Sequence, residues 1–291
     1  MGITRREFLV RATAGGVAGV MMVPAWRAVG ETDVGIRLSA CDWSLDAGGP
    51  SGLEIARRVR LDGLEVSAGG PADTLKIADP EYRKQYKDAV AQTGVVVSSV
   101  AMGLLNDAPL ATDPRGPVWL EQTIEAAEDL GAKVILLAFF GKGDLLKDRE
   151  LKNADIDVVV TRLKEAAPKA GQAGVILGIE NTLSADDNVR ILDRIQHDAV
   201  RVYYDAGNST DNGYDVPAEI RRLGDRICQF HFKDGRHYLG EGRVKMEPVA
   251  EAIRAIGYRG WIVLETSCPS KNRDADFQRN ADYVRKLLAT A

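Results

Sequence analysis

Short apolar runs alternate with longer amphipathic stretches along most of the chain. The short runs are rich in Val, Ile and Leu, whereas the longer stretches repeat apolar residues at helical spacing and close near a glycine. Strands that alternate with helices in this way are typical of parallel βαβ units. The pattern predicts eight strands, over residues 35–43, 62–67, 95–103, 132–140, 175–181, 200–208, 227–234 and 260–267.

Eight such units indicate an α/β protein built as a single-domain (β/α)8 TIM barrel over residues 35–291. The same alternation also permits an open doubly wound sheet, which would carry a glycine-rich phosphate loop after its first strand. The segment CDWSLDAGGPSG, at the end of the first predicted strand, does not match that loop pattern. No linker rich in Pro, Gly or Ser divides the chain, so the sequence favours one barrel domain.

Composition narrows the class of ligand. The 291 residues carry a formal net charge of -4, whereas proteins that bind nucleic acid usually present a basic face. We therefore expect no nucleic-acid partner, and small neutral or weakly charged substrates fit better. Cys41, Cys228 and Cys268 are too few and too scattered for a disulfide framework, so they are interpreted as core or pocket thiols.

The N-terminus has the pattern of an export signal. Paired arginines in TRREFLV, residues 4–10, precede a short apolar run diluted by Gly and Ala, which looks like a twin-arginine signal peptide. We expect a signal over residues 1–25, with cleavage after Ala25, and a connecting segment over residues 26–34. The run is too short for a stable membrane anchor. This predicts the twin-arginine translocase as a partner and a periplasmic or extracellular protein.

Four consecutive predicted strands carry a metal-ligand side chain near their C-terminal ends. These residues are Glu180, Asp205, His231 and Glu265, and a barrel of parallel strands has its active site at that end. An acid at a strand end can also cap the next helix. Three carboxylates and one imidazole in a barrel mouth would repel one another without a cation between them. Such a set suits one divalent metal ion, Mn²⁺ first, with Mg²⁺, Co²⁺ or Zn²⁺ as alternatives.

The strand-like run CQFHFKD, residues 228–234, has one polar and one apolar face. Side chains alternate across a strand, so the polar face is predicted to line the barrel lumen and the apolar face to pack against the outer helices. The polar face comprises Gln229, His231 and Lys233, and the apolar face comprises Cys228, Phe230 and Phe232.

The order Glu, Asp, His, Glu, set in GIEN, YYDAGN, HFKD and GYRGWIVLET, resembles the sugar phosphate isomerase/epimerase superfamily of xylose isomerase-like barrels. The resemblance implies that Glu180, Asp205, His231 and Glu265 bind one divalent metal. It also implies that Glu180 and Glu265 exchange protons with a substrate carbon. The activity implied is metal-dependent isomerisation or epimerisation of a sugar or sugar derivative, by proton abstraction next to a carbonyl and through an enediolate.

The resemblance has departures, and further polar residues lie near the predicted mouth. Many epimerases of this type carry a histidine where this chain has Asn208, and an acid where it has Lys245. Both changes weaken the assignment to ordinary free-ketose epimerases. An apolar wall against a sugar ring is suggested by Trp43, Phe139 and Phe140. The residues suggested to contact substrate are Glu65, Asn208, Lys233, Arg236, His237 and Trp43.

Three other functions compete with isomerase or epimerase chemistry. The first is lyase or dehydratase chemistry of the same superfamily, for example β-elimination from 3-keto-glycosides. Less favoured are a periplasmic sugar-binding protein without catalysis and an endonuclease IV-like nuclease, which would use several metals and more than the three histidines present. The sequence is also compatible with a homo-oligomer.

Overall fold

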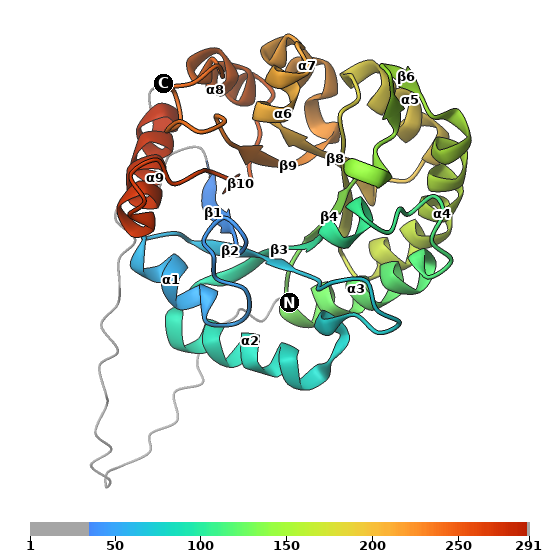
Figure 1. Ribbon diagram of the computed structural model, residues 1–291, viewed down its shortest axis with the longest axis horizontal. Helices are drawn as coiled ribbons and strands as arrows, with labels where there is room; N and C mark the ends of the chain where they lie inside the picture. Colours follow the sequence, from blue (N-terminus) through green and yellow to red (C-terminus); the bar gives the residue numbers. More distant parts are fainter. Residues whose placement is uncertain (1–34, 290–291) are drawn as a thin grey trace, which may run out of the picture. The chain divides into compact units, whose positions relative to one another are not determined.

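A computed structural model of the chain describes residues 35–289, and these form a closed barrel of parallel strands (Figure 1). Neighbouring strands follow the order β1-β10-β9-β8-β7-β4-β3-β2, so the first and last strands pair and close the sheet. The predicted (β/α)8 TIM barrel is confirmed. The barrel strands are β1 (Arg37–Cys41), β2 (Gly63–Ser67), β3 (Val96–Met102), β4 (Val134–Ala138), β7 (Ile176–Glu180), β8 (Val200–Asp205), β9 (Ile227–Phe232) and β10 (Trp261–Leu264).

Helices surround the barrel as an outer ring (Figure 1). A small antiparallel pair, β5 (Leu146–Lys147) and β6 (Glu150–Leu151), lies in the connection after β4. Across residues 35–289, none of the helices combines the length and apolar character needed to cross a membrane. The helices are α1 (Gly52–Arg58), α2 (Pro80–Thr93), α3 (Gly116–Leu130), α4 (Asn153–Gln172), α5 (Ala185–Ile195), α6 (Ala206–Asp211), α7 (Val216–Leu223), α8 (Met246–Ala255) and α9 (Arg273–Ala289).

Local sequence signals set where these helices begin and end. Helix α2 begins after Asp79, whose carboxylate accepts a hydrogen bond from the Glu81 amide, and ends at Gly94 with φ 74°. A short polar side chain at the start and a left-handed glycine at the end satisfy backbone groups that have no partner within the helix. Ser184 caps α5 in the same way.

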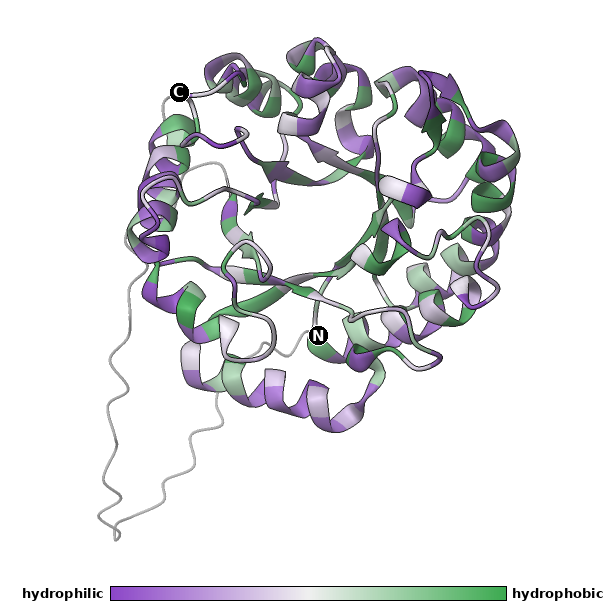
Figure 2. Ribbon diagram, in the orientation of Figure 1, coloured by the Kyte–Doolittle hydropathy of each residue, from purple (hydrophilic) through white to green (hydrophobic). Residues whose placement is uncertain are grey.

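The apolar side chains form one layer between the strands and helices and another inside the lumen. The outer layer includes Trp119, Phe230 and Phe232, which are fully buried, and Figure 2 shows the corresponding green strands and inward helix faces. The predicted outward packing of Phe230 and Phe232 agrees with this layer. The lumen cluster comprises Cys41, Ala101, Val134, Leu136, Ala138, Tyr203, Trp261 and Val263.

The predicted outward packing of Cys228 is wrong, because a β-bulge interrupts the alternation of side chains in β9. Val202 pairs with Ile227 but Tyr203 pairs with Gln229, so Cys228 is an extra residue in the ladder. A bulge breaks the strict alternation of the two faces. The Cys228 side chain packs against the lumen cluster, and Gln229 and His231 keep their predicted lumen positions.

Two strands end three residues earlier than predicted, a larger difference than at the other strands. The run at 200–208 forms a strand only to Asp205, where helix α6 begins, and the run at 260–267 ends as a strand at Leu264. Asp205 causes the first change, because its Oδ1 accepts a hydrogen bond from the Asn208 amide at 2.7 Å and so caps α6. Asn208 therefore lies on a helix at the barrel mouth. The predicted signal at residues 1–25 and the connecting segment at residues 26–34 lie outside the described residues.

Candidate metal centre and active site

The barrel brings together the four side chains that the sequence placed at strand ends. Glu180 ends β7, Asp205 ends β8, His231 lies in β9, and Glu265 directly follows β10. One potential ligand atom from each lies within 4.8 Å of the others. His231 Nδ1 is 3.0 Å from Glu180 Oε1, 3.5 Å from Glu265 Oε2 and 3.8 Å from Asp205 Oδ2. The imidazole nitrogen thus faces three carboxylates.

This donor set fits a divalent cation. Asp205 uses Oδ1 to cap helix α6, whereas its buried Oδ2 accepts no hydrogen bond from the described residues. Lys233 Nζ is 3.0 Å from that Oδ2 but without hydrogen-bond geometry. Buried carboxylate oxygens normally have a partner, and oxygen donors with one imidazole suit Mn²⁺, Mg²⁺, Co²⁺ or Zn²⁺.

Burial and neighbouring charges shift the pKa values of the cluster in different directions. Burial raises the pKa of Glu180 to about 7, although His231 opposes the rise. Burial also raises the pKa of Asp205, against the opposing effect of Lys233. For Glu265 burial again acts upward, but His231 and Lys233 outweigh it and lower the pKa. The cluster therefore holds its carboxylates in unequal environments.

Glu265 is held from two sides at the rim of the cluster. Lys233 Nζ donates to Glu265 Oε2 at 2.7 Å, and Trp43 Nε1 donates to Glu265 Oε1 at 3.1 Å. Burial acts to lower the pKa of Lys233, but the carboxylates of Asp205 and Glu265 outweigh burial and raise it. Lys233 and Trp43 thereby fix the orientation of this carboxylate, and both also line the cavity above it.

A cavity of about 730 Å³ opens above the cluster. Of the suggested substrate contacts, Trp43, Asn208 and Lys233 line it, together with Glu180 and Glu265. Phe140 also lines the cavity, whereas Phe139 is buried in the outer layer. Residues that follow β2 and β3 also line the cavity, and the sequence did not predict them because they carry no strand-end pattern. They include Gly69, Gly70, Pro71, Asn106 and Asp107.

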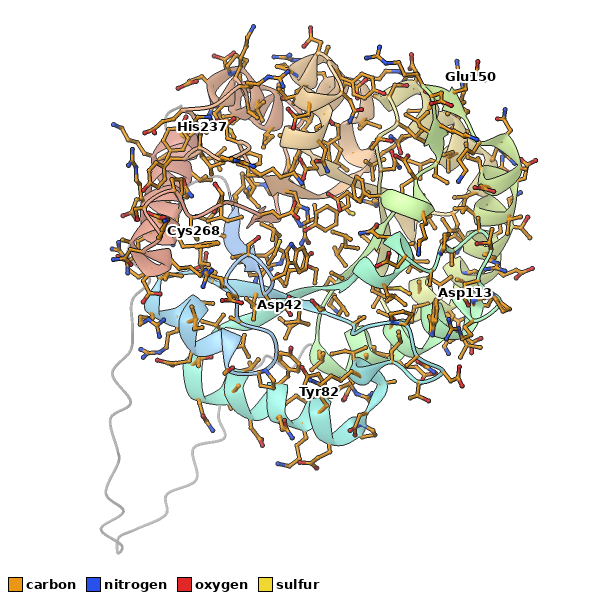
Figure 3. All side chains as sticks on the ribbon, viewed as in Figure 1. Asp42, Tyr82, Asp113, Glu150, His237 and Cys268 are labelled. Atoms are coloured by element: carbon orange, nitrogen blue, oxygen red, sulfur yellow. The ribbon has the colours of Figure 1, made fainter. Side chains whose placement is uncertain are left out.

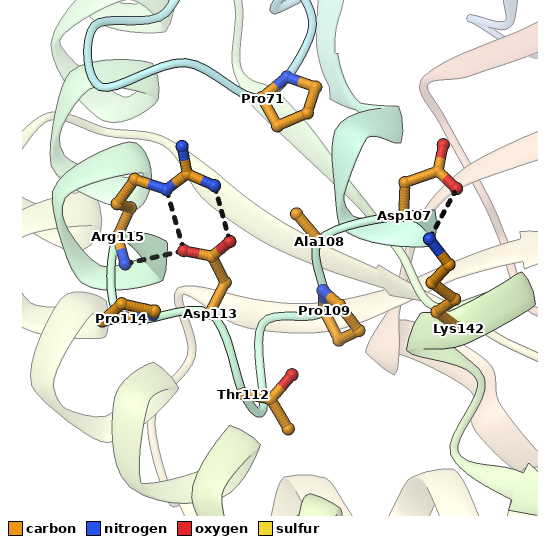
Figure 4. Close-up of a pocket in the computed structure, with 9 residues that line it drawn as sticks. All are labelled: Pro71, Asp107, Ala108, Pro109, Thr112, Asp113, Pro114, Arg115 and Lys142. Carbon is orange, nitrogen blue, oxygen red and sulfur yellow. Dashed lines mark hydrogen bonds and ion pairs between the residues drawn. The ribbon is translucent and has the colours of Figure 1, made fainter.

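A second hollow of about 540 Å³ lies beside this cavity and shares Pro71 and Asp107 with it. Figure 4 shows its charged side chains already paired. Arg115 Nη2 donates to Asp113 Oδ2 at 2.8 Å, and Lys142 Nζ lies 3.9 Å from Asp107 Oδ1. The concave surface at the mouth therefore extends beyond the region directly above the cluster.

The suggested contact between Glu65 and a substrate hydroxyl does not fit the structure. Glu65 is 0% exposed and does not line the cavity. It lies beneath the cluster, where its Oε1 is 2.8 Å from His231 Nε2. The Glu65 side chain faces the lumen, but it lies deep in the barrel, on the side of the His231 ring that is away from the cavity.

The suggested substrate contacts of Arg236 and His237 do not fit either. Both residues are exposed and neither lines the cavity, and Figure 3 shows His237 at the periphery near α9. Asp234 determines the path of their loop, because its carboxylate accepts hydrogen bonds from the amides of Gly240, Gly242 and Val244. The loop consequently curls around Asp234 and directs these two side chains outward.

Replacing Asp234 with Asn is expected to lower the free energy of unfolding by about 1–3 kcal/mol. An amide offers one acceptor oxygen where the carboxylate offers two, and hydrogen bonds to a charged acceptor contribute more than neutral ones. Urea unfolding followed by circular dichroism measures the change. The exposed Asp198→Asn is the matched control, and a change for Asp234→Asn no larger than for this control would contradict the assigned role.

Comparisons with known proteins agree with the barrel fold. A protein-family model described as xylose isomerase-like TIM barrel matches residues 53–287. A 2-epi-5-epi-valiolone 7-phosphate 2-epimerase from an Actinoplanes species is 24% identical over 204 residues, which cover 68% of this chain and 73% of that protein. An inosose dehydratase from Lacticaseibacillus casei is 25% identical over 175 residues, covering 47% of this chain and 58% of the dehydratase.

A solved structure of similar fold is the 3-keto-D-glucoside 4-epimerase from E. coli. It superposes with a TM-score of 0.71 at 15% identity and covers 86% of this chain and 99% of the other. At that identity the match supports the fold alone.

Proposed function

The chain belongs to the xylose isomerase-like TIM barrel family, and from that premise we propose a divalent-metal-dependent sugar isomerase or epimerase. The observation that carries the proposal is the convergence of Glu180, Asp205, His231 and Glu265 within 4.8 Å at the mouth of the barrel. These four side chains would hold one ion, with Mn²⁺ preferred. The epimerase among its relatives supports the reaction class.

The residues around the cluster suggest how a proton would move. A bound divalent cation would polarise a substrate carbonyl and its neighbouring hydroxyl, which acidifies the C–H bond between them. Glu180 and Glu265 come from β7 and β10, which are separated by two other strands. One carboxylate can therefore take the carbon-bound proton while the other returns one, with an enediolate form of the substrate between the two steps. Asn208 offers an amide to a substrate hydroxyl.

A lyase acting on 3-keto-glycosides is the second candidate. The same proton abstraction beside a keto group would then expel a β-leaving group. The second hollow favours a substrate larger than one sugar ring, because it lies beside the cavity and shares Pro71 and Asp107 with it. The dehydratase among the relatives is consistent with this candidate.

Proton exchange in D₂O tests both candidates. The protein is loaded with Mn²⁺, its metal content is measured, and NMR follows free ketoses, aldoses and 3-keto-glycosides in D₂O. We expect about one ion per chain and deuterium at the carbon next to the carbonyl. Deuterium uptake without loss of a group selects an isomerase or epimerase, and release of an aglycone or water selects a lyase. Sugar binding without exchange would favour a binding protein, and about three ions per chain would favour nuclease chemistry.

We also propose that the protein is exported by the twin-arginine translocase and acts outside the cytoplasm. The support is the sequence pattern around Arg5 and Arg6 at the N-terminus. Carbohydrates met outside the cytoplasm are mostly unphosphorylated, which agrees with a substrate that is a free sugar or a glycoside.

Replacing both Arg5 and Arg6 with Lys is expected to abolish export. Lysine keeps the positive charge but not the planar guanidinium that a twin-arginine receptor reads. Cell fractionation and immunoblotting of the tagged protein measure the outcome. The matched control is Arg27→Lys, which lies beyond the predicted signal. Export of the doubly substituted protein at the level of the parent would contradict the assignment.

A further inference from the structure

A buried polar network lies beneath the candidate metal ligands. It joins Glu65 of β2, Ser99 of β3, Tyr203 of β8 and Gln229 of β9 to His231. Each of these residues is at most 1% exposed. Barrel lumens are ordinarily filled by branched apolar side chains, and buried polar groups are costly unless every one is paired. A network of this size inside the barrel therefore calls for a role.

The hydrogen bonds around Glu65 have fixed directions. Ser99 Oγ and Tyr203 OH lie 2.6 and 2.8 Å from Glu65 Oε2. A carboxylate only accepts hydrogen bonds, so both hydroxyls donate to it. Gln229 Nε2 lies 2.8 Å from Ser99 Oγ and 2.9 Å from Tyr203 OH. Since both hydroxyl hydrogens are directed to Glu65, the amide must present its two N–H groups to the hydroxyl oxygens.

The same directions determine the hydrogen on His231. Glu65 Oε2 already accepts two hydrogen bonds, and its Oε1 lies 2.8 Å from His231 Nε2. That contact requires the imidazole to donate its Nε2 hydrogen to Glu65. The other ring nitrogen, Nδ1, faces the carboxylates of Glu180, Asp205 and Glu265. In the neutral ring, Nδ1 therefore carries the lone pair that a metal ion needs.

We propose that Glu65 is a positioning residue that holds His231 in the Nε2–H tautomer, with Nδ1 directed at the metal, while Ser99, Tyr203 and Gln229 hold Glu65. The inference rests on the metal site of the proposed function. A carboxylate that accepts the second N–H of a ligand histidine fixes the ring and increases its basicity, and loss of such a partner typically lowers metal affinity by about 10- to 100-fold.

Two irregularities of the sheet build this network. The ladder between β2 and β3 shifts after Leu64, so that Glu65 pairs with Ser99. The bulge in β9 brings Tyr203 opposite Gln229 and Asp205 opposite His231. Bulges re-aim side chains next to active sites. Here they set the Glu65 carboxylate at the depth where it meets the imidazole from below.

A second metal ion at this level is the competing interpretation. Cys41 Sγ lies 3.5 Å from both Glu65 Oε1 and His231 Nε2, and the three residues form a group close enough to hold an ion. Such an ion would need the lone pair of Nε2. The directed network instead occupies Nε2 with a hydrogen and uses the Glu65 oxygens as hydrogen-bond acceptors.

Glu65→Gln is expected to weaken metal binding by about 10- to 100-fold. Mn²⁺ affinity is measured by competition with a chelating dye, in a variant whose fold is checked by circular dichroism. Tyr203→Phe removes one of the two hydroxyl groups that donate to Glu65, so we expect a smaller loss of Mn²⁺ affinity. This variant provides the test if Glu65→Gln does not fold. Ser39→Ala is the matched control, because Ser39 bonds Ser98 within the lumen and does not contact Glu65.

Histidine NMR of the Zn²⁺-loaded protein provides a readout that does not depend on turnover. Long-range ¹H–¹⁵N spectra should show His231 with a metal-bound Nδ1 and a protonated, exchange-protected Nε2, assigned with His231→Gln. Glu65→Gln should remove that protection. A ring with Nε2 on the metal, an affinity for Glu65→Gln within twofold of the parent, or a second ion lost in Cys41→Ser would each overturn the proposal. Absence of isomerase activity would not affect these measurements.

Discussion

Glu180→Gln and Glu265→Gln are each expected to slow proton exchange and turnover by about 10²- to 10⁴-fold. Glutamine keeps the size and one oxygen of each side chain, but it cannot accept a proton from carbon. The two residues approach the cluster from β7 and β10. Under the proposed mechanism, either substitution removes one of the two groups that serve the opposite faces of the substrate carbon. The rates are measured by NMR in D₂O at saturating Mn²⁺, with metal content determined on the same samples.

The control for this pair is Glu247→Gln, which changes an exposed glutamate in the first turn of α8. It should leave the rate unchanged. A substitution that lowers only metal occupancy would recover its rate at high Mn²⁺, whereas loss of a proton-transfer group would not. Full exchange in both Glu180→Gln and Glu265→Gln with metal bound would remove these residues from the chemistry.

The barrel and the positions of the four clustered residues can be predicted from local features of the sequence. Alternation of apolar runs with amphipathic stretches specifies the βα units. Within each strand, the period of two and the C-terminal position place Glu180, Asp205 and Glu265 at the lumen end. Each residue is placed by its own strand, and closure of the barrel then brings the strand ends, and with them these side chains, close together.

The misplaced residues depend on relations between strands or on loops. Cys228 faces the lumen because of a bulge in the pairing of β9 with β8, and pairing register is not encoded in one strand alone. The depth of Glu65 below His231 is likewise set by the ladders that flank β2. Arg236 and His237 are directed outward by amide hydrogen bonds to Asp234, which a charge pattern does not reveal.

The position of His231 between two buried carboxylates has an energetic consequence. Its ring lies 2.8 Å from Glu65 and 3.0 Å from Glu180, and all three side chains are nearly inaccessible to solvent. Burial opposes charge on the ring, but Cys41 and the surrounding carboxylates outweigh it and raise the pKa of His231. In metal-free protein the imidazole is thus the group that compensates both acids.

His231→Ala is therefore expected to lower the free energy of unfolding of metal-free protein by about 3–5 kcal/mol, the typical cost of leaving a buried charge without its partner. Chemical denaturation in EDTA measures it. His237→Ala, at an exposed position, should change stability by less than about 0.5 kcal/mol. The double variant Glu65→Gln/His231→Ala tests the interaction between Glu65 and His231, because neutralising Glu65 removes one of the two uncompensated charges. The free energy of unfolding that the double variant loses should be smaller than the sum of the losses in the two single variants. Additive losses, or a cost for His231→Ala as small as that of His237→Ala, would mean that the ring contributes packing alone.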